Sequence, residues 1–137
     1  MDDLVDVAAY FDHVQTMWEG YGCTARDVAG ERIFEYETDD EGRLNGLGHL
    51  LVELKFPGYD DSYLDVEDWL EPHTGHIRRA EYAYDLIHGG ARLDCWHWHE
   101  GEYHTHDGRD RRPIARATLE DVINVSYRIL EKAPPNP

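Results

Sequence analysis

Apolar residues recur at helical spacing at both ends of the chain. Near the N-terminus this spacing predicts a helix over 3–19 that Asp2 and Asp3 cap, and its apolar positions are Leu4, Val7, Ala8, Phe11, Val14 and Trp18. Near the C-terminus the run Thr118–Asp121 resembles a capping box, and the apolar stripe behind it predicts a second helix over 118–132. The proline-rich residues 133–137 are expected to form a frayed tail.

Between the helices the apolar positions alternate with period two, which is typical of strands with one buried face. The pattern predicts strands over about 31–37, 50–56, 62–70 and 77–87, followed by a histidine-rich hairpin, so that the sheet spans 31–106. Gly89–Gly90 predicts a tight turn into this hairpin. On the fourth strand the alternation places Ala80, Tyr82, Tyr84 and Leu86 on one side, and Arg79, Glu81, Ala83 and Asp85 on the other.

These elements predict an α+β fold, in which an antiparallel β-meander of about five to six strands carries the N-terminal and the C-terminal helix on one face. The length of 137 residues suits a single domain over 1–137. The sequence has no internal repeat, no linker, no signal peptide pattern and no apolar stretch of membrane-spanning length. We therefore expect a soluble, cytoplasmic protein that does not associate with membranes.

Acidic residues dominate the charge. The chain has 29 Asp and Glu against 13 Lys and Arg, a formal net charge of −16. The carboxylates are spread through well-patterned segments, and the only lysines are Lys55 and Lys132, which together indicate a halophilic source. Because contact with phosphates is driven by basic residues, the acidity disfavours an RNA substrate. At molar salt the Debye length is about 3 Å, so the net charge has little reach and RNA is not excluded. Cys23 and Cys95 are expected to be reduced thiols.

Four of the nine histidines fall within residues 97–106, where they alternate with Trp, Tyr and Thr. If Glu100–Gly101 forms a two-residue turn, His97 lies opposite His104, His99 opposite Glu102, and Cys95 opposite His106. One side of the ribbon then carries Cys, His and Glu, and the other carries Trp96, Trp98 and Tyr103. The aromatic side can pack on a helix or sheet, which leaves the imidazoles facing a cleft or solvent.

This histidine cluster admits more than one chemistry. The imidazoles can serve as general acid and base, and arginines can stabilise phosphate charge, as in a metal-independent ribonuclease. A zinc ion could instead be bound by His97, His99, His104 and His106, with Cys95 as a further soft ligand, although the spacing is not a common zinc signature. The histidines could also do no more than titrate on an acidic surface, and the aromatic side chains could simply be part of the core. In that case the protein could be a non-catalytic module that binds another protein.

Several segments of the chain together resemble the TumE-like family of toxin–antitoxin proteins. They are Ile77–Asp85 with its Tyr-x-Tyr strand, Arg92–Asp94, Tyr103–Gly108 with its His-x-His pair, and Thr118–Val122, within a likeness that covers roughly residues 4 to 130. The chain differs from the family where Cys95 replaces an Asn, and where the short segment before His104 carries the extra His97 and His99.

The resemblance implies an α+β toxin that acts on RNA, or blocks translation, and that is neutralised by an antitoxin encoded nearby. It implies roles for Arg92, Asp94, His104 and His106, with Tyr82 and Tyr84 as framework. Strand parity puts Asp94 on the aromatic side, which favours an orienting or structural role for it.

Our hypothesis is therefore an RNA-cleaving toxin without a cofactor. His104 and His106 are the acid–base candidates, and His97 and His99 assist them. Arg79, Arg92 or Arg109 would hold phosphate, and Tyr82 and Tyr84 could stack on bases. The sequence leaves open the RNA target, and it leaves open whether the chain is a monomer or a homodimer.

Overall fold

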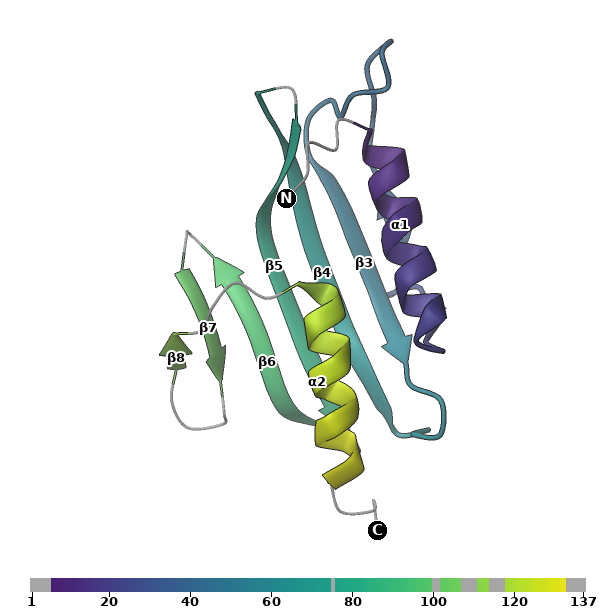
Figure 1. The fold of residues 1–137 in the computed structure, drawn as a ribbon, viewed down its shortest axis with the longest axis vertical. Helices are drawn as coiled ribbons and strands as arrows, with labels where there is room; N and C mark the ends of the chain where they lie inside the picture. Colours follow the sequence, from purple (N-terminus) through teal and green to yellow (C-terminus); the bar gives the residue numbers. More distant parts are fainter. Residues whose placement is uncertain (1–5, 75, 100–101, 107–110, 114–117, 133–137) are drawn as a thin grey trace.

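Two helices cover one face of an antiparallel sheet in the computed structural model (Figure 1). It describes residues 6–74, 76–99, 102–106, 111–113 and 118–132, and of these the side chains of 76, 99, 102–106 and 111–113 are not described. The described elements are α1 (Val7–Gly20), β1 (Thr24–Arg26), β2 (Phe34–Glu35), β3 (Gly48–Lys55), β4 (Ser62–His73), β5 (His76–His88), β6 (Ala91–His99), β7 (Glu102–His106), β8 (Arg111–Pro113) and α2 (Leu119–Lys132).

The strands follow one another as a meander, in the order β1-β3-β4-β5-β6-β7-β8, and β2 also pairs with β3. Every strand pair is antiparallel. The predicted α+β meander with a helix at each end is therefore confirmed. Neither described helix combines the length and the apolar composition that crossing a bilayer requires.

The structure corrects several of the predicted boundaries. Helix α1 begins at Val7 because the Asp6 side chain accepts the backbone N–H groups of Ala8 and Ala9 at 2.9 and 3.3 Å. The predicted helix residues 3–5, with the caps Asp2 and Asp3, lie outside the described residues, as does the predicted tail 133–137.

The strand predicted over 31–37 shrinks to β2, and the sheet extends beyond 31–106 through β1 and β8. Strand β1 pairs with Glu53–Lys55 of β3, whereas β2 pairs with His49 and Leu50 of the same strand. Because the two short strands share one edge of β3, neither can extend along its whole length.

The hydrophobic core lies between the sheet and the two helices. Strand β3 alternates buried and half-buried residues, with Leu50, Val52 and Leu54 buried. Helix α1 adds Phe11 and Trp18, whose rings lie 4.9 and 5.7 Å from the Phe34 ring. Helix α2 buries an amphipathic stripe made of Leu119, Val122, Ile123, Ser126 and Leu130.

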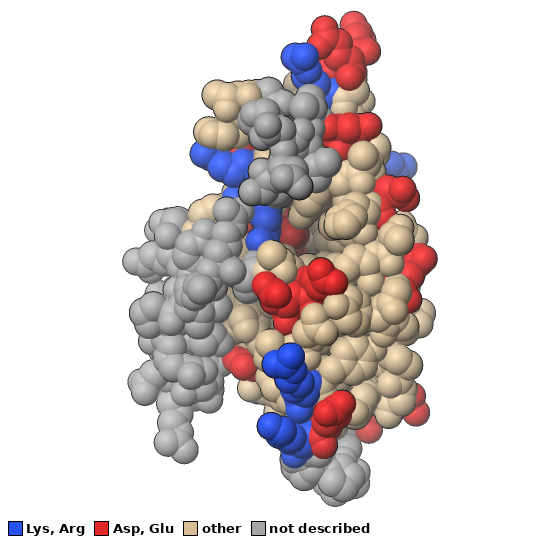
Figure 2. Space-filling model, viewed as in Figure 1, with Lys and Arg blue, Asp and Glu red and all other residues tan. Residues whose placement is uncertain are grey.

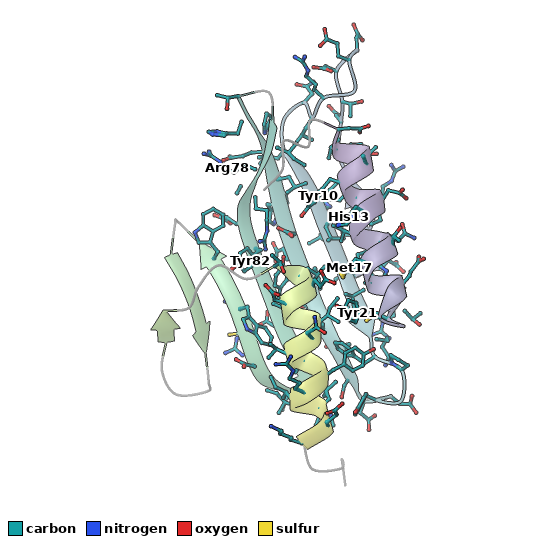
Figure 3. All side chains as sticks on the ribbon, viewed as in Figure 1. Tyr10, His13, Met17, Tyr21, Arg78 and Tyr82 are labelled. Atoms are coloured by element: carbon teal, nitrogen blue, oxygen red, sulfur yellow. The ribbon has the colours of Figure 1, made fainter. Side chains whose placement is uncertain are left out.

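The two helices meet at Tyr21, which directly follows α1. Its hydroxyl donates to Glu120 of α2 at 2.8 Å and accepts from the Asn124 side chain at 3.0 Å. The Tyr127 hydroxyl donates to the Tyr21 backbone carbonyl at 2.6 Å. Figure 3 shows Tyr21 at the end of a series of α1 residues along the side of that helix that faces α2. The C-terminal end of α1 is thereby bound to α2.

A β-bulge in β5 decides where Arg79 points. Trp69 pairs with Glu81 but Leu70 pairs with Arg79, so Ala80 is an extra residue on β5. An extra residue reverses the alternation of sides, and Arg79 joins Tyr82 and Tyr84 on the face that the helices cover. The prediction that Arg79 lies on the side of the strand opposite to the tyrosines is therefore wrong, because the simple alternation of period two does not anticipate the bulge.

A second bulge, in β6, decides where the histidines point. Gly89–Gly90 forms the predicted turn, but Leu86 pairs with Asp94 and Ile87 with Arg92, so that Leu93 is the extra residue. The shift pairs Tyr84 with Trp96 and Tyr82 with Trp98 on the helix-covered face. Cys95 and His97 consequently belong to the opposite face of the sheet. We call this opposite face the open face; it carries Glu53, Asp65, Asp85, Cys95 and His97.

Candidate functional site

The open face carries a histidine paired with a carboxylate. The Nε2 atom of His97 in β6 lies 3.1 Å from Oδ1 of Asp85 in β5, and both side chains are 22% exposed. A guanidinium nitrogen of Arg92 lies 3.5 Å from the same oxygen, and the Arg92 side chain is 47% exposed. The predicted site residues His97 and Arg92 are therefore brought together by the Asp85 carboxylate, which is not among the predicted site residues.

Cys95 completes the cluster. One ligand atom each of Asp85, Cys95 and His97 lie within 4.8 Å of one another. Cys95 is fully buried, yet it is not part of the core cluster between the sheet and the helices, in agreement with its place on the open face.

The other cysteine has a different setting. Neither Cys23 nor Cys95 takes part in a disulfide, in agreement with the predicted reduced thiols. Cys23 belongs to the core cluster, where burial raises its pKa to about 11 although a hydrogen bond with Tyr127 partly lowers it. Cys23 is therefore a protonated core thiol at neutral pH and provides a natural control for experiments on Cys95.

The register of the histidine hairpin agrees with the prediction where it is described. His97 pairs with His104, and His99 pairs with Glu102. The pairing continues only to Trp96 and Thr105, so the predicted pair of Cys95 with His106 is not among the described ones. The side chains of His99, His104 and His106, the turn 100–101 and Arg109 lie outside what the structure describes. The predicted four-histidine zinc set can therefore be placed only through His97.

Asp94 lies away from the histidine. It pairs with Leu86 on the helix-covered face, the side that strand parity predicts. Its carboxylate accepts the backbone N–H of Cys95 at 2.8 Å. This contact supports the orienting role, because it fixes the backbone between the bulge and Cys95.

The remaining predicted substrate residues form a buried polar cluster on the helix-covered face. The Arg79 guanidinium donates to the Tyr84 hydroxyl at 2.6 Å, and this hydroxyl donates to the Asp68 carboxylate at 2.8 Å. Arg79 also lies over the Tyr82 ring, 4.0 Å from its centroid, and the Tyr82 and Tyr84 rings stack. Arg79 and Asp68 are 5% and 3% exposed. Figure 3 places Tyr82 near the middle of β5 and Arg78 toward one end of it.

The protonation states within this buried cluster follow from its contacts. Burial alone lowers the pKa of Arg79, but the oxygens of Tyr84 and Asp68 raise it overall, so the guanidinium stays charged. Burial and the Asp68 carboxylate raise the pKa of Tyr84 well above 10.0, so its hydroxyl remains a donor. Arg79 therefore bridges two oxygen acceptors inside the protein, on the opposite side of the sheet from His97.

Acidic residues form a row across the open face. The register places Arg26, Glu53, Asp65, Asp85 and Cys95 opposite one another on five successive strands. Asp65 therefore lies between two carboxylates. Loss of hydration, followed by the negative charges of Asp85, Glu53 and Glu67, raises the pKa of Asp65 above 3.8. By contrast, the acidic side chains on the helix side are dispersed over the surface (Figure 2).

We expect the Asp65→Asn substitution to stabilise the protein at neutral pH by about 0.2–1 kcal/mol, since directly opposed like charges destabilise a sheet. The folded protein binds the Asp65 proton more tightly than the unfolded chain, so the contribution of Asp65 to stability falls as pH rises above 3.8. The gain from the substitution should therefore vanish at acid pH. Urea unfolding between pH 3 and pH 7, with chelator present, measures this difference.

The control for this experiment is Asp12→Asn, which removes an exposed carboxylate from α1. This variant should show no comparable rise in relative stability between acid and neutral pH. If Asp65→Asn follows the same pH course as Asp12→Asn, the carboxylates of the row do not repel one another measurably.

No family model, curated protein or solved structure matches the chain. Its function must therefore be inferred from the chemistry of its own side chains. The cluster on the open face combines an imidazole, a carboxylate that can orient it, a guanidinium and a thiol. These groups are suited to acid–base catalysis at a phosphate, or to binding a metal ion.

Proposed function

We propose that the protein is an RNA-cleaving toxin of a toxin–antitoxin module, similar to the TumE-like family, with His97 as an acid–base group on the open face. The observation that supports this proposal most directly is the shared contact of His97 and Arg92 with Asp85, at 3.1 and 3.5 Å. A carboxylate beside an imidazole fixes its orientation and its tautomer. A nearby arginine supplies the charge that a phosphate requires.

The proposed reaction uses the 2′-hydroxyl of RNA as the nucleophile. With Nε2–H of His97 donating to Asp85, the acceptor nitrogen of the ring is Nδ1, which takes the 2′-hydroxyl proton. The 2′-oxygen forms a bond to the adjacent phosphorus, and the bond from phosphorus to the 5′-oxygen breaks. A second imidazole protonates the departing 5′-oxygen. We assign this acid role to His104, the backbone partner of His97 in β7, with His99 and His106 assisting.

Arg92 has the exposure that contact with a phosphate requires. Its guanidinium can leave the 3.5 Å contact with Asp85 and bind the charged oxygens of the phosphate, which attract it more strongly than one shared carboxylate. Arg79, in contrast, is buried on the helix-covered face of the sheet, so we assign the role of phosphate binding to Arg92. Tyr82 and Tyr84 then act as framework.

The proposed biological setting is the cytoplasm, where RNA and translation are found. The partner is an antitoxin encoded beside the toxin. The acidic composition, with a net charge of −16, fits an enzyme that meets RNA at high salt, where long-range repulsion is screened.

RNA cleavage is tested with purified protein in high-salt buffer containing chelator. We expect RNA to be cut into products with 2′,3′-cyclic phosphate and 5′-hydroxyl ends. An all-deoxy oligonucleotide of the same sequence should stay intact because it lacks the nucleophile. Expression of the gene alone should arrest growth and degrade RNA, and co-expression of the neighbouring gene should restore growth. A folded protein that leaves RNA intact, or that cuts both oligonucleotides alike, would contradict the proposal.

A further inference from the structure

We infer that Asp85, Cys95 and His97 bind a zinc ion, and that this ion switches off the RNA cleavage proposed above. The three ligand atoms lie within 4.8 Å of one another, on adjacent strands of one sheet. The binding site depends only on the contacts of these three side chains. Its regulatory effect rests on the proposed function.

The donor set is one that zinc accepts. Thiolate sulfur, imidazole nitrogen and carboxylate oxygen bind zinc at about 2.0–2.3 Å, and in a tetrahedron neighbouring ligand atoms lie roughly 3.3–3.7 Å apart. The 3.1 Å separation of His97 Nε2 and Asp85 Oδ1 is already close to such an edge. The widest separation is at most 4.8 Å, and binding would require the Cys95 or Asp85 side chain to rotate so that it shortens. Three protein ligands leave a fourth position open for water or another ligand.

The surroundings also favour a divalent cation. Asp85 stands in the acidic row directly opposite Asp65, which in turn lies opposite Glu53, so three carboxylates lie side by side on adjacent strands. A bound cation at Asp85 would relieve the repulsion between them. Cys95 is buried, whereas Asp85 and His97 are each 22% exposed, so an ion can enter beside them and reach the sulfur. The Arg92 side chain is 47% exposed and can move away from Asp85 into solvent.

Zinc binding would change the protonation of the site. The Cys95 thiol releases its proton to solvent and binds as thiolate, and His97 binds as neutral imidazole. When zinc occupies Nε2, the ring proton resides on Nδ1. This nitrogen then cannot accept the 2′-hydroxyl proton, so the zinc form is expected to be inactive. Removal of zinc restores the hydrogen bond between His97 and Asp85, and with it the base.

Zinc binding is tested on the full chain after chelation and dialysis, with a phosphine reductant present. Calorimetric titration with zinc should show one tight site per chain in the wild-type protein. Cys95→Ser, Cys95→Ala and Asp85→Asn should each weaken this site more than about 100-fold, beyond what loss of an outer partner costs. Cys23→Ser is the matched control, because it removes the other buried thiol, and it should bind zinc as the wild type does.

Cobalt supplies a second measurement that reports the sulfur ligand directly. The wild-type protein and Cys23→Ser should show a thiolate-to-cobalt charge-transfer band, and both Cys95 variants should lack it. Circular dichroism and urea unfolding of the metal-free variants establish that they are folded. Zinc affinity that survives in Cys95→Ala and Asp85→Asn would place the metal elsewhere and overturn the inference.

The regulatory effect is read as the ratio of RNA cleavage rates with and without zinc. We expect zinc to suppress cleavage by the wild type and by Cys23→Ser, and chelator to restore it, while the ratio stays near one in Cys95→Ala. If the protein binds zinc as expected but does not cut RNA, the zinc site is supported and the proposed function is refuted. If a saturating concentration of zinc does not change the cleavage rate, the regulatory effect of zinc is refuted and the proposed function is still supported.

Discussion

Replacing Asp68 with alanine should lower the free energy of unfolding by about 3–5 kcal/mol, because it leaves a buried guanidinium without its carboxylate. Arg79 is 5% exposed, and its guanidinium donates to the Tyr84 hydroxyl and to Asp68. The Tyr84 hydroxyl would also lose its acceptor. Arg79→Met should have a comparable cost, since it removes the guanidinium that neutralises the buried Asp68 carboxylate.

The adjacent arginine provides a matched control. Arg78 pairs with Glu71 through Nε at 2.8 Å, but its side chain is 49% exposed, against 6% for Arg79. Arg78→Met should therefore change the free energy of unfolding by less than about 1 kcal/mol. The free energies of unfolding of both variants are measured by urea titration, and the dependence on urea concentration should be the same for both. Equal costs at the two positions would show that the buried pair adds nothing beyond a surface ion pair.

A combined replacement separates the net value of the cluster from the cost of breaking it. In the triple variant Asp68→Leu, Arg79→Met, Tyr84→Phe, both charges and the hydroxyl that contacts them are removed together. We expect this protein to be far more stable than the sum of its single variants implies, and close to the wild type, because apolar side chains of similar volume can replace buried ion pairs.

The fold could be predicted because its central strands obey a simple period. Leu50, Val52 and Leu54 alternate without interruption in β3, and both helices carry continuous apolar stripes. The shortness of β2 could not be predicted, since it depends on competition with β1 for one edge of β3. Local sequence carries no information about such a partner.

The site could be predicted only in part, because some of its strand pairings follow from counting residues and others depend on a bulge. A two-residue turn fixes a register by counting, so the pairing of His97 with His104 could be predicted. Counting from the turn at Gly89–Gly90 would instead place Asp85 opposite Asp94, because the count does not include the bulge at Leu93. Neither Leu93 nor Ala80 is a residue type that marks a bulge. Asp85 therefore went unassigned, and Arg79 was placed on the wrong side of its strand.

Replacing His97 with alanine should slow RNA cleavage by about 100-fold or more, since general acid–base groups contribute 10²–10⁴-fold. The side chain is 22% exposed and belongs to the open face, so its removal should leave the core intact. The rate is measured under single-turnover conditions with chelator present, and urea unfolding checks the fold. His49→Ala is the control, because His49 is also on the open face, in β3, where its ring packs on Trp69.

Asp85→Asn distinguishes catalysis by His97 from a merely structural role. If the carboxylate holds Nε2–H in place, the amide variant should cut RNA more slowly than the wild type at an unchanged Michaelis constant. Nitrogen chemical shifts of His97 should then report a mixture of tautomers where the metal-free wild type has the Nε2–H form. The proposal fails if His97→Ala cuts RNA as fast as His49→Ala. It is also contradicted if the tautomer of His97 is the same with and without the Asp85 carboxylate, because the 3.1 Å contact would then orient nothing.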